Sequence, residues 1–192
     1  MCAIIECAND SILMFLAGKD NNMNTPDARK RRTMNDIIYT NPDFAKKIID
    51  YFQPSGFCVE PCKGESESFY QHLPEPKDWC ELAEGKDFLI YEPPQHVDWI
   101  ITNFPWSGKA LRPMVRQACK ISDNVVHLIR LHNVFGTFAR HKDFRDEGHR
   151  LKEIIIVPWK DSFINKAPEG FVLCVIHTQK NYTGDCKWTY WI

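Results

Sequence analysis

Glu60, Glu81 and Asn103 each follow a short apolar run of this sequence, at the point where a predicted strand ends. In an open α/β sheet, ligands bind beyond the carboxyl ends of the strands. A carboxylate at the end of a second strand is well placed to accept hydrogen bonds from ribose hydroxyl groups. The sequence therefore predicts a ligand site at one sheet edge, with these three polar side chains as its first candidates.

The elements that must position these residues alternate along the chain from residue 39 onward. Asn41 followed by Pro42 is typical of a helix N-terminus, because the amide caps free N–H groups and proline fits the first helical position. Apolar residues then recur at helical spacing as far as Phe52. Further along the chain, we expect strands at 57–59, 79–82, 88–91, 97–102 and 125–129, a short helix at 66–72 and a longer one at 108–121.

The C-terminal part of the chain indicates a different connection. Two β-rich runs, 152–157 and 170–177, are joined by a polar loop in which no crossover helix fits. Strands joined in this way pair as an antiparallel hairpin. The whole order predicts an α/β domain that has a mainly parallel sheet, helices on both faces and an antiparallel strand near the C-terminus.

The run that ends in Asn103-Phe104-Pro105-Trp106 resembles a known catalytic motif. It is similar to the Asp/Asn/Ser-Pro-Pro-aromatic motif of the S-adenosylmethionine-dependent DNA amino-methyltransferases of adenine-N6 and cytosine-N4 type. Residues 57–64 resemble the family's first motif, an acidic residue, proline and cysteine before a glycine-rich turn. Residues 79–88 look like its ribose- and adenine-contacting segments, and 39–42 like the motif that helps to seat the methionine moiety. These segments stand in the family's order and cover about residues 39–160.

The resemblance implies a Rossmann-like class I methyltransferase fold with S-adenosylmethionine as cofactor. It places the catalytic role on Asn103, Phe104, Pro105 and Trp106. The positions that it implies for cofactor binding are Tyr39, Thr40, Glu60, Pro61, Cys62, Gly64, Glu81, Asp87 and Phe88. No metal is expected, because no two cysteines have the two-residue gap typical of zinc ligands.

The chemistry explains why such residues are wanted. An exocyclic amine conjugated to a base is a poor nucleophile. The Asn103 amide oxygen and the Phe104 carbonyl can each accept one amine hydrogen bond, which favours a pyramidal nitrogen whose lone pair faces the methyl sulfonium. Stabilising the developing positive charge is then the main task. Trp106 offers a face on which an extruded base can stack, and Pro105 biases its predecessor away from helical geometry.

Methylation of adenine N6 in DNA is the favoured activity. Two positions depart from the family's pattern: Phe104 replaces the first proline, and Ser66 stands in the turn where the family usually has Gly-x-Gly. Glycine there lets the backbone approach the cofactor closely. Two alternatives follow, namely a catalytically weakened methyltransferase-like protein that binds nucleic acid or protein, and an enzyme that methylates RNA or a protein amide.

A basic region between residues 107 and 152 predicts a nucleic-acid face. It holds ten Lys and Arg residues against four Asp and Glu residues, in a chain of net charge −1. Such local asymmetry suits contact with phosphates. DNA is the expected partner and RNA a possible one, and the small size of the chain suggests a partner subunit for target recognition. The candidate residues are Lys109, Arg112, Arg116, Arg140 and Lys142.

Composition completes these expectations. A hydrophobic fraction of 44% and a charged fraction of 26% are ordinary for a globular protein. Residues 1–38 are predicted to be a partly mobile N-terminal extension, and 39–192 the methyltransferase-like domain. No run reaches the length of a membrane span, and no basic region precedes the first apolar residues. We therefore expect a cytoplasmic protein without membrane contact, whose eight cysteines are free thiols.

Overall fold

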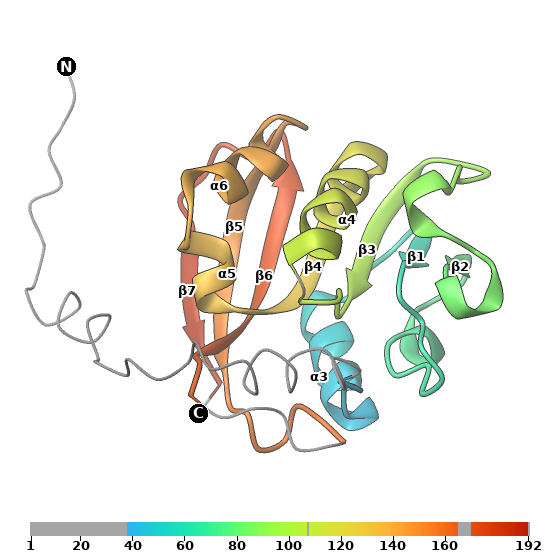
Figure 1. The fold of residues 1–192 in the computed structure, drawn as a ribbon, viewed down its shortest axis with the longest axis horizontal. Coiled ribbons are helices and arrows are strands. Elements are labelled where there is room, and N and C mark those ends of the chain that lie inside the picture. The colour runs from blue at the N-terminus through green and yellow to red at the C-terminus, as the bar shows by residue number, and fades with distance from the viewer. Residues whose placement is uncertain (1–37, 107, 165–169, 192) are drawn as a thin grey trace, which may run out of the picture. The chain divides into compact units, whose positions relative to one another are not determined.

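A seven-stranded sheet organises the part of the chain that the computed structural model describes, which is residues 38–106, 108–164 and 170–191 (Figure 1). The strands lie in the order β2-β1-β3-β4-β6-β5-β7. Their bounds are β1 Cys58–Glu60, β2 Lys77–Trp79, β3 Val97–Thr102, β4 Ser122–Arg130, β5 His149–Val157, β6 Leu173–Lys180 and β7 Lys187–Tyr190.

Strand direction follows the predicted pattern. The neighbours β2, β1, β3 and β4 pair in parallel, whereas β6 is antiparallel to both β4 and β5. The expected mainly parallel sheet with a C-terminal antiparallel hairpin is therefore confirmed. The edge strand β7, which pairs in parallel with β5, was not expected. Its side chains are mostly exposed, so its sequence lacks the apolar alternation that marks a half-buried strand.

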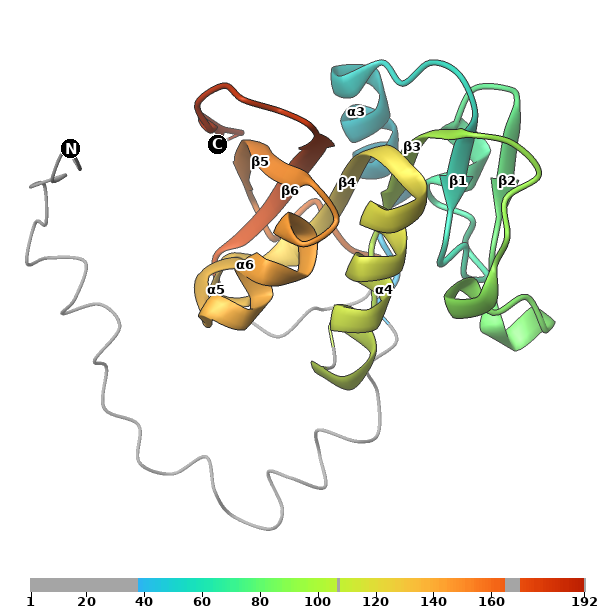
Figure 2. The same cartoon turned by 90° about the horizontal axis from the view of Figure 1, so that it is seen from above.

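Helices cover both faces of the sheet, as Figure 2 shows from above. The side chains of successive strand residues point to opposite faces, so Ile100 packs into one core and Ile101 into the other. Helix α3 covers the Ile101 side, and α4, α5 and α6 cover the Ile100 side. None of the described helices is long and apolar enough to cross a membrane. The helix bounds are α3 Pro42–Phe52, α4 Gly108–Ile121, α5 Leu131–Phe135 and α6 Phe138–Arg145.

Two predicted strands differ from the structure. The run 88–91 was expected to be extended, but Phe88–Ile90 is a 3₁₀ helix, η3, whose first turn Asp87 caps by accepting a hydrogen bond from the Leu89 amide at 2.9 Å. The second strand ends at Trp79, earlier than expected, and Glu81 caps the next 3₁₀ helix, η2, at Leu82–Glu84. A short apolar run is compatible with a strand or with a helical turn. Here the acidic residue before each run accepts a backbone hydrogen bond from the first turn, which favours the 3₁₀ helix.

A partly buried ion pair fixes α6 against α4. Asp143 is only 2% exposed, and both of its oxygens accept hydrogen bonds from Arg112, at 2.6 and 2.9 Å. Arg116 lies farther away, 3.9 Å from Asp143 and 3.6 Å from Glu147. A bidentate guanidinium is the geometry that best compensates a carboxylate removed from water.

Removing this guanidinium should destabilise the fold. We expect Arg112→Ala to lower the unfolding free energy, because Asp143 would keep a buried carboxylate without its bidentate partner. Urea unfolding measures the change, and adding Asp143→Asn to the variant should recover part of the loss. Lys109→Ala, at an exposed position of the same helix, is the matched control. Equal midpoints for the two single variants would contradict the pairing.

Candidate functional site

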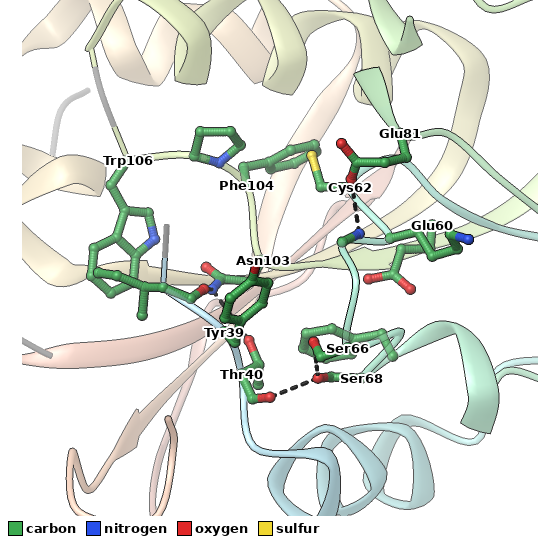
Figure 3. A pocket seen from close by; sticks show the side chains of 15 residues that line it. Tyr39, Thr40, Glu60, Cys62, Ser66, Ser68, Glu81, Asn103, Phe104 and Trp106 are labelled. Atoms are coloured by element: carbon green, nitrogen blue, oxygen red, sulfur yellow. Dashed lines mark hydrogen bonds between the residues drawn. The ribbon is translucent and has the colours of Figure 1, made fainter. Parts of the chain in front are cut away.

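A cavity of about 330 Å³ opens beside the ends of β1 and β3 (Figure 3). This volume lies within the usual range of small-molecule sites. Ten of the thirteen residues that the sequence assigned to catalysis or cofactor binding line it. They are Tyr39, Thr40, Glu60, Cys62, Gly64, Glu81, Asn103, Phe104, Pro105 and Trp106.

Strand register explains why residues distant in the sequence meet here. Glu60 pairs with Trp79 of β2, so Glu81 stands two residues beyond that pair. On the other side of β1, Val59 pairs with Ile100 of β3, which brings the end of β3 to the same edge. The carboxyl ends of three parallel strands therefore converge on one cavity, as the sequence predicted.

The Asn103 amide has a defined orientation. Its Nδ2 donates to Thr40 Oγ1 at 3.2 Å, with a longer contact of 3.5 Å to the Ile38 carbonyl. Its Oδ1 is buried and has no hydrogen-bond partner among the described residues. An unpaired buried acceptor is costly, and a ligand that donates a hydrogen bond would remove that cost. Asn103 thus lines the cavity with its amide held through nitrogen and its oxygen left as an unpaired acceptor.

Glu60 presents a second acceptor without a partner. The residue is 1% exposed, and its Oε2 is buried with no hydrogen bond to the described residues. Burial raises the pKa of this carboxyl well above its ordinary value. A hydrogen bond from the Tyr70 backbone and the charge of Lys63 oppose this rise, and the nearby Glu67 and Glu81 reinforce it. A positively charged donor in the cavity would favour the ionised form of Glu60.

Glu81 joins two parts of the cavity wall. Its Oε2 accepts a hydrogen bond from the Gly64 amide at 2.8 Å, and its Oε1 accepts one from the Ala83 amide at 3.1 Å. Each carboxylate oxygen can accept a further bond, so capacity remains for hydroxyl groups of a ligand. Gly64 has a φ of +62°, a conformation that favours glycine, and the Tyr39 ring lies close to its missing side chain.

The turn at residues 64–68 is tied to Asn103 by hydrogen bonds. The Ser66 and Ser68 hydroxyl groups lie 2.8 Å apart, and Ser68 Oγ donates to the Thr40 carbonyl at 2.6 Å. Thr40 in turn holds Asn103. The serine that replaces a family glycine therefore belongs to a continuous hydrogen-bonded chain, drawn partly as dashed lines in Figure 3, and the cavity remains open beside it.

The Trp106 ring is held from several sides. Its Nε1 donates to the Leu128 carbonyl at 3.3 Å, and its ring makes edge-to-face contacts with Phe163 and Trp159. The Arg130 guanidinium lies 4.6 Å from its centroid. A base that stacks on Trp106 must therefore share the indole with these neighbours or displace one of them.

Phe104 fixes the segment 103–106 through its packing in the core. Its side chain is 1% exposed and packs against the rings of Phe88 and His127, with centroid distances of 6.3 and 5.3 Å. Burial lowers the pKa of His127 to about 3, so a neutral imidazole meets the Phe104 ring edge to face. Packing thus holds Phe104, which stands where the motif that the sequence resembles has a proline.

Three predicted cofactor residues lie outside the cavity wall. Asp87 caps η3, Phe88 packs beneath Phe104, and Pro61 is buried. The sequence did not single out Lys63 and Ser68, which both line the cavity. Lys63 forms ion pairs with Glu67 and Glu84, each at 2.9 Å. Nothing in the local pattern marks these residues, because their roles depend on side chains brought in by the fold.

None of the five predicted nucleic-acid residues lines the cavity. Arg112 and Arg116 contact Asp143 between α4 and α6, and Arg140 donates to the His132 carbonyl and to Asn133. Lys109 and Lys142 are exposed, and neither lines the cavity. Their contact with nucleic acid stays a prediction.

A further polar cluster lies at the other end of β3 and β4. The side chains of His96, Asp98 and Asp123 approach within 4.8 Å of one another, which is close enough to share a metal ion. Their groups already have protein partners, since Asp98 accepts from the Phe57 amide at 2.7 Å and His96 lies 2.8 Å from Asp123. This cluster is separate from the cavity at the carboxyl edge.

Comparisons with known proteins identify the architecture but no close relative. No protein-family model matches the sequence, and no curated protein matches it. A Pyrococcus horikoshii protein named as a candidate RNA methyltransferase aligns over 72% of this chain and 83% of its own, with 15% identity and a TM-score of 0.52. The fold is that of the class I methyltransferases.

Two other solved structures share this methyltransferase fold over part of their length. The methyltransferase subunit of a Streptococcus thermophilus type I restriction-modification system aligns over 78% of this chain, with 12% identity and a TM-score of 0.52. The M protein of the type I restriction enzyme EcoKI aligns over 80%, with the same identity and TM-score. The chain covers only 45% and 46% of these two proteins.

The raised pKa of Glu60 predicts a pH-dependent effect of Glu60→Gln. The pKa of this carboxyl is higher in the folded state than in the unfolded state. Its contribution to stability is therefore fully present when the pH is below the unfolded-state pKa, and it is lost as the pH rises through the folded-state pKa. The uncharged glutamine should therefore make the protein more stable than wild type at pH 8 and give little difference near pH 4. Denaturant midpoints across this range test the effect, and Glu65→Gln, at an exposed neighbour, should show no such trend. An advantage of Glu60→Gln that grows towards acid would refute the assignment.

Proposed function

We propose that this protein is an S-adenosylmethionine-dependent methyltransferase that acts on an exocyclic amine of a nucleic-acid base, with adenine N6 in DNA as the favoured target. The observation that carries the proposal is the Asn103 amide, whose nitrogen is bound to Thr40 and whose oxygen is unpaired in the cavity wall. Such a fixed acceptor suits an amine that must be held by its N–H group during attack.

The cavity has the groups that the cofactor needs. When bound, S-adenosylmethionine supplies an electrophilic methyl group on a sulfonium. Glu81 keeps acceptor capacity for ribose hydroxyls, and the unpaired Glu60 oxygen would face a donor such as the ammonium of the methionine moiety. Tyr39 and Thr40 adjoin both the glycine turn and Asn103, so they would seat that moiety next to the reaction centre.

The chain's own groups account for activation of the amine. Asn103 Oδ1 would accept one N–H of the target amine and stabilise the positive charge that grows on nitrogen during attack. The bond from its Nδ2 to Thr40 prevents the amide from presenting its donor side instead. The packing of the Phe104 ring in the core would hold its own backbone carbonyl in place, so that this carbonyl accepts the second N–H of the target amine.

The names of similar structures favour a nucleic-acid target. Two are subunits of restriction-modification systems, and one is a candidate RNA methyltransferase. We propose that a partner subunit takes part in target recognition, because one of these similar structures is named as a subunit of a larger restriction-modification system. RNA and protein amides are the rival substrates that the assays must include.

Loss of the amide should abolish transfer but not cofactor binding. Asn103→Ala should lower the single-turnover rate of methyl transfer to adenine-containing DNA by on the order of a hundredfold or more, because the amide acts mainly as charge develops. Calorimetry should show nearly unchanged affinity for S-adenosylmethionine. Asn103→Asp, which keeps an acceptor oxygen, should retain more activity than alanine. Full activity of the alanine variant would sink the mechanism.

Glu81→Ala should have the opposite signature. We expect it to weaken cofactor binding by about 1–3 kcal/mol, since ribose hydroxyls and the Gly64 amide would lose their acceptor. With saturating cofactor, the transfer rate should recover much of its wild-type value. Glu92→Ala, at an exposed acidic position outside the cavity wall, is the matched control. Equal cofactor affinity in the two variants would remove Glu81 from the site.

A further inference from the structure

A second cavity, of about 320 Å³, lies where α6 ends and β5 begins. Lys142 and Arg145 follow Phe138 by four and seven residues, so these three side chains share one face of α6. Arg150, the second residue of β5, adds a third cation. We call this space the basic cavity; the described residues that line it include Phe138, Lys142, Arg145, Asp146, His149 and Arg150.

The basic cavity lies at the sheet edge opposite Asn103. Both β4 and β5 run antiparallel to β6, so these two strands point in the same direction. The first residue of β5 is His149, whose Nε2 lies 2.9 Å from the carbonyl oxygen of Ser122, the first residue of β4. The basic cavity is therefore at the amino edge of the sheet. The nine residues of β4, about 26 Å of extended chain, separate that edge from the carboxyl edge.

The three cations of the basic cavity are not used in holding the fold together. The side chains of Lys142, Arg145 and Arg150 are exposed and make no hydrogen bond or ion pair with the described residues. By contrast, Arg112 of the neighbouring helix α4 is paired with Asp143. Like charges that gather without counter-ions repel one another, and an anionic ligand would remove this cost.

Helix geometry accounts for only part of this arrangement. The dipole of a helix stabilises cations in its last turn, where Lys142 and Arg145 stand in α6. Arg150 lies outside that helix, on β5. Phe138 is an apolar ring that is 73% exposed, although it stands beside the cations. These two residues indicate a ligand that carries negative charge and also has a flat group able to stack.

We propose that the basic cavity binds a single nucleic-acid strand, whose phosphates contact Lys142, Arg145 and Arg150 while an unpaired base stacks on Phe138. Proteins that bind single strands combine a positively charged groove with aromatic rings on which bases stack. A guanidinium group also matches two oxygens of a phosphate. An acidic peptide would satisfy the cations but would leave the ring without a base. Because this site is separate from the cavity at the carboxyl edge, the inference does not depend on the proposed function.

The test measures how the full chain binds a short labelled thymidine oligonucleotide, by fluorescence anisotropy over a range of salt. Thymine has no exocyclic amine, so failure of the proposed methyl transfer would leave the measurement unchanged. The matching uridine oligonucleotide shows whether the site prefers DNA or RNA, and a polyglutamate peptide represents an acidic protein segment. Lys47→Gln, at an exposed position of α3 on the other face of the sheet, controls for the loss of one charge.

Loss of a single guanidinium should change the salt dependence of binding. Arg145→Gln and Arg150→Gln should each weaken binding roughly tenfold at low salt and lower the slope of log K against log salt by about one. Lys47→Gln should leave both quantities unchanged, and Arg150→Lys, which keeps the charge, should keep the wild-type slope. Circular dichroism confirms that each variant is folded. An unchanged slope in Arg150→Gln, or an equal fall in Lys47→Gln, would overturn the proposal.

Phe138 separates a nucleic-acid strand from other anions. Phe138→Ala should weaken binding of the oligonucleotide about tenfold through lost stacking, with the slope kept because no phosphate contact is removed. The same variant should leave the weaker binding of polyglutamate unchanged. Wild-type affinity of Phe138→Ala for the oligonucleotide would refute the stacked base. Polyglutamate binding as tight as that of the oligonucleotide would refute the nucleic-acid strand as the ligand.

Discussion

The geometry of the site depends on one hydrogen bond, from Asn103 Nδ2 to Thr40 Oγ1. An amide can present either its donor or its acceptor side, and this bond selects the acceptor for the cavity. Thr40 is itself fixed, because Ser68 donates to its carbonyl and Ser66 lies within hydrogen-bond distance of Ser68. Two segments more than sixty residues apart in sequence are thereby coupled. The cofactor side and the reaction centre of the proposed site therefore share one rigid support.

The same contacts explain how the site accommodates the two positions at which the sequence departs from the motifs that it resembles. Ser66 removes a glycine from the turn, yet its hydroxyl extends the chain of bonds that reaches Asn103. Phe104 lacks the rigidity of a proline ring, but its side chain is locked between Phe88 and His127. In both places side-chain contacts take over a task that backbone restriction performs elsewhere. The substitutions are compatible with an ordered site.

Sequence patterns predicted the parallel sheet, the C-terminal hairpin and most of the cavity wall, because strand ends and helix caps are local signals. The prediction of a strand at 88–91 was wrong, because four apolar residues fit a strand and a turn of helix equally well. The Asp87 side chain caps the first turn and so favours the 3₁₀ helix. The ion pair of Arg112 with Asp143 could not be predicted, because the two residues are distant in the sequence. The edge strand β7 could not be recognised, since exposed residues carry little periodic signal.

The reversed direction of β6 has a consequence for how such a domain can diversify. Because β6 runs against β5, the connection between them starts and finishes at the same edge as Asn103. The paired strands fix both ends of that connection, and lengthening a loop with fixed ends adds only a small entropic cost. Residues 162–164 of this connection are an exception, because they pair with the segment before α3: Thr40 bridges Phe163, and the Asn41 amide donates to the Ser162 carbonyl at 2.9 Å. The β5–β6 connection can therefore vary in length outside residues 162–164, whereas a change at those residues would reach Thr40 and, through it, both Asn103 and the glycine turn.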